Sequence, residues 1–111
     1  MKFSTKDGPS FIVGGVEGFA VTTSAAIQSG DVAMLEVTGR HGRTKTDLSD
    51  RFYYVIKGEG TFDVGANHYE ISKGDLVVVP KCTDYDFEGK MELLMFCSPA
   101  FDAAHEIPLE G

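Results

Sequence analysis

The stretch from Arg51 to Pro80, RFYYVIKGEGTFDVGANHYEISKGDLVVVP, decides the fold. It consists of short runs rich in β-branched and aromatic residues, separated by glycine-containing turns, a pattern typical of antiparallel strands. The runs predict strands at 51–58, 60–65, 68–72 and 75–80. Turns are expected at 58–60, 65–67 and 73–75, where glycine or asparagine supplies the positive φ angles that hairpins need.

The same pattern continues on both sides of this stretch. Further strands are predicted at 11–15, 18–27, 32–39, 84–89 and 91–99, with a turn at 29–31. Helical periodicity is absent from the middle of the chain. The tail from Ala100 to Gly111 is expected to form a single helical turn or a strap. The sequence therefore predicts an all-β protein.

Length and composition limit the possible functions. A chain of 111 residues with 42% hydrophobic residues is about one domain with one core. The formal charge of −7 repels phosphate backbones and anionic lipids, so neither a nucleic acid nor a membrane is expected as a partner. The N-terminus lacks an apolar signal region, and no window approaches the ~18 apolar residues of a membrane span. We expect a cytoplasmic protein whose Cys82 and Cys97 are free thiols, with Cys97 buried.

Alternation along the strand from Arg51 predicts which side chains point inward. One face carries Arg51, Tyr53 and Val55, and the opposite face is also largely apolar because it carries Phe52, Tyr54 and Ile56. A strand with two apolar faces needs a second layer or a partner subunit to cover it. A barrel that forms a homodimer satisfies this requirement.

Two glycine-centred motifs carry a resemblance to a known family. The cupin family has a first motif G(X)5HXH(X)3-4E(X)6G and a second motif G(X)5PXG(X)2H(X)3N, and here Gly58, Gly74 and Pro80 match. The closing residues CSPAFD at 97–102 also resemble the exit of small cupins. The resemblance covers about residues 30–102. It implies a cupin-type jelly-roll β-barrel, with residues 1–111 as a single domain and 103–111 as a C-terminal tail.

The metal-ligand places of the motifs hold other residues. Arg51 stands at the glutamate place and Tyr85 at the place of the third histidine, while Cys82 and Gly89 replace the second glycine and the asparagine. The first two histidine places fall on Thr44 and Thr46, or on Lys45 and Asp47 with the shorter spacing. An arginine cannot bind a metal, and its charge repels a divalent ion. The resemblance therefore implies that the usual metal site is lost, and no cofactor is predicted.

A displaced metal site is the alternative. His41, in the loop before the first motif, could turn toward the barrel mouth beside Asp47 or Asp50, with Tyr85 as a further ligand. His68 alternates with Glu70 on a polar face and is expected to point to solvent. A divalent metal held by His41, Asp50 and Tyr85 is thus the alternative to a metal-free barrel.

The replacing residues suggest a binding pocket. If Arg51 projects into the barrel with Tyr53 and Tyr85, while Thr44 and Thr46 line its mouth, the pocket offers a guanidinium fork, hydroxyl donors and aromatic walls. These groups suit a small carboxylate, a phosphate or an acidic sugar. In the competing interpretation, Arg51 pairs with a nearby acid such as Glu36 or Asp50 and only fills the space of the metal.

Three functions remain open. The first is metal-independent binding of a small anionic or sugar-like metabolite. The second is an enzyme of the isomerase, epimerase or lyase type, either metal-free or with the displaced metal. Since no histidine is otherwise expected to face the barrel interior, a metal-free enzyme would depend on Tyr53 and Tyr85, with Asp47 or Glu36. The third is a structural or interaction protein with a filled barrel.

Overall fold

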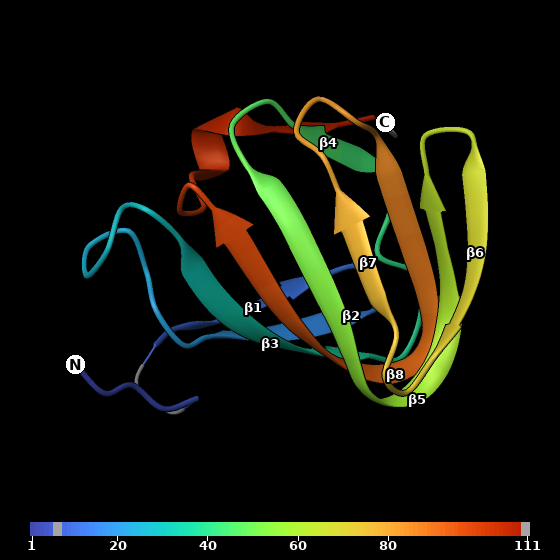
Figure 1. Ribbon diagram of the computed structural model, residues 1–111, viewed down its shortest axis with the longest axis horizontal. Coiled ribbons are helices and arrows are strands. Elements are labelled where there is room, and N and C mark those ends of the chain that lie inside the picture. The colour runs from blue at the N-terminus through green and yellow to red at the C-terminus, as the bar shows by residue number, and fades with distance from the viewer. Residues whose placement is uncertain (6–7, 110–111) are drawn as a thin grey trace.

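The computed structural model describes residues 1–5 and 8–109 (Figure 1). These residues form antiparallel strands and one short 3-10 turn, η1, as the sequence predicts for an all-β protein. The elements are β1 Ser10–Val13, β2 Val16–Ala20, β3 Asp31–Val37, β4 Thr44–Thr46, β5 Asp50–Val64, β6 Asn67–Ser72, β7 Leu76–Val79, β8 Tyr85–Ser98, η1 Ala103–His105 and β9 Glu106–Pro108. No helix in the described ranges is long and apolar enough to cross a membrane.

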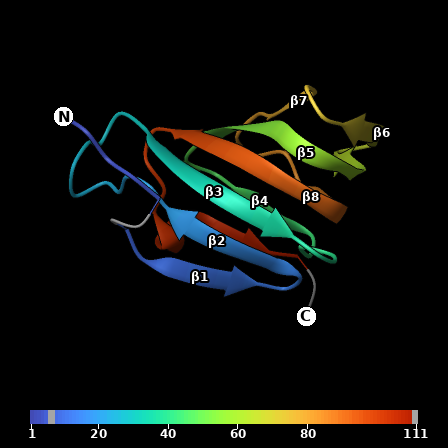
Figure 2. The ribbon, with the colours of Figure 1, turned by 90° about the horizontal axis from the view of Figure 1, so that it is seen from below.

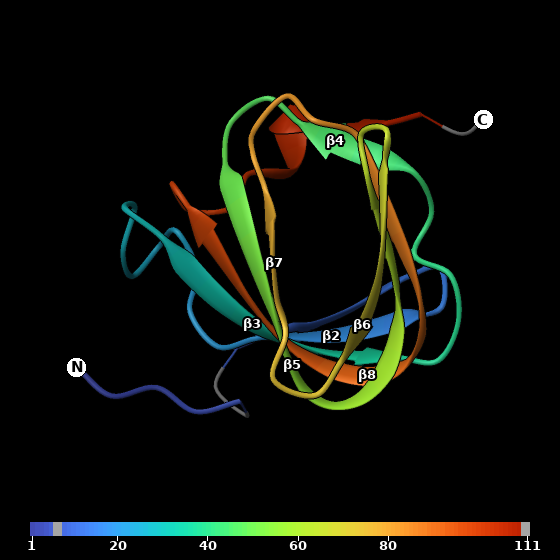
Figure 3. The same ribbon diagram turned by 45° about the vertical axis from the view of Figure 1, so that its right-hand side comes forward.

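Two long strands, β5 and β8, organise the molecule. They pair with each other along nearly their whole lengths, from Asp50↔Ser98 to Val64↔Tyr85. On its other edge β5 pairs first with β7 and then with β6, while β8 pairs with β3 and touches β4. Figure 2 shows β1, β2, β3, β8 and β5 side by side in that order. The sheet curls so that its two arms face each other across a barrel interior (Figure 3).

Glycines at the bend let the two long strands turn without breaking. The β5–β8 register shifts between Val55 and Lys57, which marks a β-bulge. Gly58 has a φ of 85°, and a Cβ there would lie 2.2 Å from the Lys90 carbonyl oxygen. Gly89 on β8, which is paired with Gly60, has a φ of 147°. The close approach of two backbones at this corner therefore requires glycine.

At this corner the structure differs from the predicted turn and from two pairs of predicted strands. The turn expected at 58–60 is wrong, because Gly58 and Gly60 lie inside β5 and the strands predicted at 51–58 and 60–65 are one. The strands expected at 84–89 and 91–99 are likewise one strand, β8, that passes through Gly89. Glycine supplies a bend here rather than a reversal. The hairpin turns expected near Gly65 and Gly74 are confirmed, with φ angles of 57° and 94°.

Other differences lie at the ends of the chain. The strand predicted at 18–27 ends at Ala20, and β4 and β9 were not expected as strands. The tail forms a 3-10 turn capped by Asp102, whose side chain accepts a hydrogen bond from the Ala104 amide at 2.9 Å. We call residues 102–109 the C-terminal strap. With β4 it lies across one end of the barrel (Figures 1 and 3).

The inner face is packed with apolar and aromatic side chains. As alternation predicts, Arg51, Tyr53 and Val55 are buried, whereas Tyr54 is exposed. Phe62 and Phe87 stack with ring centroids 4.6 Å apart, and Tyr53 packs on both of them. The core that results consists of Val16, Ala33, Leu35, Val37, Tyr53, Val55, Phe62, Val64, Ile71, Val77, Val79, Tyr85, Phe87, Met91, Leu93, Met95 and Cys97.

Candidate functional site

A buried polar network occupies the barrel below the strap. Arg51 lies near the start of β5, Tyr53 is two residues farther along the same face, and Tyr85 begins β8. Arg51 Nη1 donates a hydrogen bond to Tyr85 Oη at 2.6 Å, and Tyr53 Oη donates to the same oxygen at 3.1 Å. Their residual exposures are only 4%, 1% and 0% for Arg51, Tyr53 and Tyr85. Arg51, Tyr53 and Tyr85 thus contact one another inside the barrel, as the sequence predicts.

Glu106 supplies the counterion of this network. Its Oε1 lies 2.7 Å from Arg51 Nη2, and the ring of Phe101 covers the guanidinium at 5.5 Å from its centroid. Glu106 comes from β9, which pairs with β4 through Thr46↔Glu106. The sequence-based expectation that Glu36 or Asp50 pairs with Arg51 is therefore wrong. A residue of the C-terminal strap has that role.

His41 joins the network from the loop before β4. Its ring stacks on Tyr85 and Phe87, with centroids 5.8 Å and 4.6 Å away. The backbone places it there, because the His41 amide donates to the Phe87 carbonyl oxygen at 2.8 Å and Asp86 Oδ1 accepts from the Gly42 amide at 2.9 Å. The expectation that no histidine faces the barrel interior is wrong. We call Arg51, Tyr53, Tyr85, Glu106 and His41 the Arg51 cluster.

Burial sets the protonation of the cluster. Loss of solvation raises the pKa of Tyr53 well above its usual value and also raises the pKa of Tyr85, although the nearby Arg51 charge opposes both shifts. Both phenols are therefore protonated at neutral pH. Burial lowers the pKa of His41, so its ring is neutral there. His41 Nδ1 lies 2.8 Å from the Gly42 carbonyl oxygen; a hydrogen bond to that acceptor needs the proton on Nδ1 and leaves Nε2 as an acceptor.

The other predicted site residues lie apart from the cluster. Thr44 Oγ1 donates to the Ile107 carbonyl oxygen at 3.0 Å and so ties β4 to the strap, whereas Thr46 Oγ1 accepts from the nearby Leu48 amide at 3.2 Å. Asp47 Oδ1 faces His105 Nδ1 at 2.7 Å. Glu36 is exposed on the outer face of β3. The structure brings neither Asp47 nor Glu36 to Arg51.

The residues present do not fit the metal of the resembled family. Arg51 stands at the carboxylate place with its guanidinium against Tyr85 and Glu106. His41 does touch Tyr85, but Asp50 is exposed and accepts from the Lys81 amide at 2.9 Å. No group of three His, Cys, Asp or Glu side chains able to hold a metal occurs within residues 1–5 and 8–109. The displaced site of His41, Asp50 and Tyr85 is therefore not assembled.

The cysteines and His68 are placed as expected. Cys82 and Cys97 are free, and Cys97 is fully buried, where loss of solvation raises the pKa of its thiol to about 12. Cys82 is exposed and has a positive φ of 64°. His68 is exposed and faces Asp63 at 2.5 Å. Cys82 and His68 lie outside the Arg51 cluster, whereas Cys97 is paired with Arg51 across β5 and β8 and lies beside its side chain.

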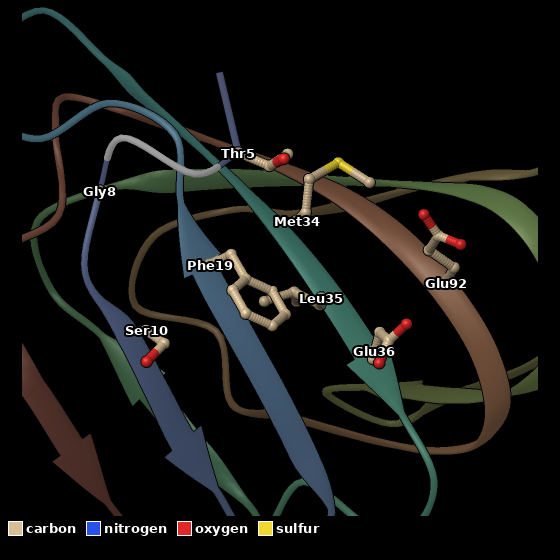
Figure 4. Close-up of a pocket in the computed structure, with 8 residues that line it drawn as sticks. All are labelled: Thr5, Gly8, Ser10, Phe19, Met34, Leu35, Glu36 and Glu92. Carbon is tan, nitrogen blue, oxygen red and sulfur yellow. The ribbon is translucent and has the colours of Figure 1, made fainter. Parts of the chain in front are cut away.

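A groove of about 520 Å³ lies elsewhere, on the outer face of the sheet. Figure 4 shows the Glu36 and Glu92 carboxylates at one end of it, Ser10 at the other, and Phe19 with Met34 between them. The groove is open and contains no side chain of the Arg51 cluster. Its chemistry does not match the buried polar network, so we place the candidate site at the cluster.

Glu106 is the cluster member that sequence reasoning missed, and His41 was expected at the barrel mouth only as a ligand of the alternative metal site. His41 precedes a three-residue strand, and its place depends on backbone pairing with β8, 46 residues away in the chain. Glu106 depends on the β4–β9 pairing in the tail. The only local signal was Asp102, a favourable cap residue ahead of a short helical turn.

A family model for the cupin domain matches residues 30–97. No curated protein matches the chain. Pac13 from Streptomyces, a nucleoside dehydratase, has a solved structure with a TM-score of 0.91 and 23% identity over 99% of this chain and 91% of that one. KdgF from Halomonas sp. has a TM-score of 0.77 and 17% identity over 94% and 97% of the two chains. Oxalate decarboxylase from Bacillus subtilis has 0.85 and 17% over 98% of this chain and 32% of that one. At such identities the likeness shows the fold.

Proposed function

This chain belongs to the cupin domain family, and we propose that it is a metal-independent cupin that binds a small anionic or sugar-like metabolite at the Arg51 cluster and eliminates water from it. The single observation that carries the proposal is the hydrogen-bonded chain Tyr53–Tyr85–Arg51 with a neutral histidine stacked on it. Such a set contains an acid, a base and a fixed positive charge. General acid–base catalysis uses the acid and the base, and the fixed charge stabilises negative charge that develops during the reaction.

The similarity to Pac13 supports a nucleoside as the class of ligand. That protein has been solved with uridine in three single variants, which change one histidine to glutamine and each of two tyrosines to phenylalanine. This chain has a histidine and two tyrosines in the same order, His41, Tyr53 and Tyr85, and the spacings agree to within two residues. The three meet in the barrel here.

The cluster supplies both proton transfers of a dehydration. Water loss takes a proton from one carbon and a hydroxyl group from its neighbour, and it forms a carbon–carbon double bond. In our proposal His41 Nε2 accepts the proton from carbon, and the Tyr85 hydroxyl protonates the departing oxygen. Arg51 Nη1, 2.6 Å from Tyr85 Oη, stabilises the phenolate left behind. Return of the proton from His41 to Tyr85 through solvent restores the site.

A thermal-shift and calorimetric screen tests the binding step. The panel contains uridine and other nucleosides, their 5′-phosphates, free pentoses and sugar acids. A ligand at a hundredfold excess over its dissociation constant stabilises the protein by about 2.7 kcal/mol. Mass spectrometry of each incubated ligand then detects loss of one water. The proposal predicts a bound nucleoside-like ligand whose conversion His41→Gln abolishes, and it fails if no member of the panel binds.

A filled barrel without a ligand is the second candidate, and one observation favours it. Tyr53 and Tyr85 are nearly inaccessible, and Glu106 already neutralises Arg51, so the polar cluster is almost self-contained. In that function the cluster replaces the metal only as internal structure. Substitutions in the cluster would then change stability alone, and no panel member would shift the melting temperature.

We further propose that a second copy of the chain covers the outer face of β5, β7 and β8. Apolar side chains stand next to one another across these strands, because Phe52 pairs with Phe96 and Val78, and Tyr54 pairs with Leu94 and Leu76. The Phe52 and Phe96 rings are 5.8 Å apart. Most of these side chains remain exposed, so the patch is contiguous and unpartnered. A homodimer about this face would remove it from water.

A further inference from the structure

The Arg51–Glu106 ion pair uses only one of two available contacts. Arg51 Nη2 meets Glu106 Oε1 at 2.7 Å. Arg51 Nε and Glu106 Oε2 are both buried and have no hydrogen-bond partner. In a guanidinium, Nε and Nη2 share one edge, which is the edge that a carboxylate grips with both oxygens. Here the second hydrogen bond of that bidentate pair, between Nε and Oε2, is not made, although the guanidinium is buried away from solvent.

The two unpaired atoms have opposite hydrogen-bonding requirements. Arg51 Nε can only donate, and the ionised Glu106 carboxylate can only accept. A hydroxyl group does both, because its oxygen accepts from Nε while its proton goes to Oε2. A phosphate or carboxylate oxygen accepts from Nε but leaves Oε2 unsatisfied and repels its charge. The complementary group is therefore a hydroxyl.

The charges of the cluster favour the same conclusion. Arg51 Nη1 already donates to Tyr85 and Nη2 to Glu106, so Nε is the guanidinium nitrogen that has no partner. Glu106 balances the charge of Arg51, and both phenols are neutral. Asp31, whose Oδ1 also lacks a partner, adds a further carboxyl beside Arg51. No excess of positive charge remains in the cluster to attract an anion.

Glu106 is also in a position to reach a ligand. Its side chain keeps 22% of its exposure, compared with 5% for the Arg51 side chain, so it stands at the boundary between solvent and the interior. Backbone pairing of β9 with β4 and the Asp47–His105 contact fix the strap that carries it. A hydroxyl group held by Arg51 Nε and Glu106 Oε2 would lie on the edge of the guanidinium opposite Nη1 and its contact with Tyr85.

We propose that Arg51 Nε and Glu106 Oε2 form a hydroxyl-recognition site that selects uncharged polyhydroxyl ligands and rejects phosphorylated or carboxylated ones. The inference rests on the proposed function and decides between its two ligand classes. It makes Glu106 the residue that determines specificity. An anion would be accepted only after the Glu106 charge is removed.

Matched ligands test the inference with the unaltered protein. Isothermal titration compares uridine, 2′,3′-dideoxyuridine and uridine 5′-phosphate. We expect the dideoxy compound and the phosphate each to bind at least about tenfold more weakly than uridine, because a site built for a hydroxyl penalises its absence. Equal or tighter binding of the phosphate overturns the inference, as does undiminished binding of the dideoxy compound.

Glu106→Gln tests the role of the carboxylate. The variant keeps the size of the side chain and removes its charge, so uridine should bind at least about tenfold more weakly while inorganic phosphate gains measurable affinity. Asp63→Asn, which makes the same change in an exposed contact with His68, should alter neither affinity. Unchanged affinities in Glu106→Gln contradict the inference.

Inorganic phosphate separates this inference from the proposed function. If no nucleoside or sugar binds, the proposed function fails. The inference then still requires that phosphate binds Glu106→Gln and not the unaltered protein. Phosphate binding to the unaltered protein at this site contradicts the inference, irrespective of whether any nucleoside binds. Should Glu106→Gln not fold, the ligand comparison with the unaltered protein decides alone.

Discussion

Arg51 Nη1 lies 2.6 Å from Tyr85 Oη, and both atoms are buried in the barrel. These two residues stand where the cupin motifs have a glutamate and a histidine, so a hydrogen bond has replaced two metal–ligand bonds. The positive charge that a metal would supply is now part of a side chain. Neutral phenols and a neutral imidazole surround it, which is a setting for acid–base chemistry without a metal.

Tyr85→Phe should weaken both stability and function. The change removes the acceptor of Arg51 and of Tyr53, and leaving buried donors unpaired costs about 1–3 kcal/mol of unfolding free energy. If Tyr85 is the acid, turnover should fall about 10²–10⁴-fold. Urea unfolding and turnover of the bound nucleoside measure the two effects. Tyr69→Phe, on an exposed side chain of β6, is the control and should change neither.

The pH dependence should report on His41. Burial lowers its pKa below the usual 6.5, so the unfolded chain binds the proton more readily than the folded protein. The free energy of unfolding therefore carries no penalty from His41 above pH 6.5, and it decreases as the pH falls below 6.5 because the unfolded chain takes up the proton first. Activity that needs neutral His41 should also persist below pH 6.5 before it declines. Urea titrations from pH 7.5 to 4.5 should show that His41→Gln lacks this part of the loss, and an identical profile would contradict the assignment.

Gly89→Ala should be strongly destabilising. Its φ of 147° is unfavourable for alanine, and the new Cβ would lie 2.5 Å from the Glu59 carbonyl oxygen. Gly74→Ala is the matched control, because Gly74 has a positive φ of 94° but nothing within 4 Å of a Cβ. Backbone strain alone costs about 1–3 kcal/mol, so Gly89→Ala should exceed Gly74→Ala in chemical unfolding. Equal losses would show that the corner tolerates the added carbon.

Leu76→Lys should prevent the proposed dimer. Leu76 is 57% exposed on β7 in the apolar outer patch, where a charge costs little in the monomer but is buried in a dimer. Analytical ultracentrifugation of the unaltered chain should give twice the mass of the variant. Lys57→Glu, at a charged position outside the patch, is the control. A monomeric unaltered chain contradicts the proposal.

Much of the barrel could be predicted from sequence because its signals are local. Alternation placed Arg51, Tyr53 and Val55 on the inner face, and the turn glycines Gly65 and Gly74 fixed two hairpins. The error at 58–60 arose because a glycine in a reversal and a glycine in a bent strand have the same local signature. Only the pairing with β8 distinguishes them.

The candidate site was predicted only in part, and that part came from the spacing of the family motifs and not from strand patterns. Arg51 and Tyr85 could be found because counting along the family motifs from their conserved glycines assigns these two positions. His41 and Glu106 reach the cluster through backbone contacts with β8 and β4, which join segments far apart in the chain. Charge alone suggested Glu36 and Asp50 as partners of Arg51, but Glu36 lies on the outer face of β3 and Asp50 is exposed at the start of β5.

Metal analysis of the protein purified without chelators tests the central claim most directly. We expect iron, manganese, nickel and zinc each far below one equivalent per chain, because Arg51 binds Tyr85 and Glu106 in the place of a metal. Stoichiometric metal that Tyr85→Phe or His41→Gln removes would contradict the account.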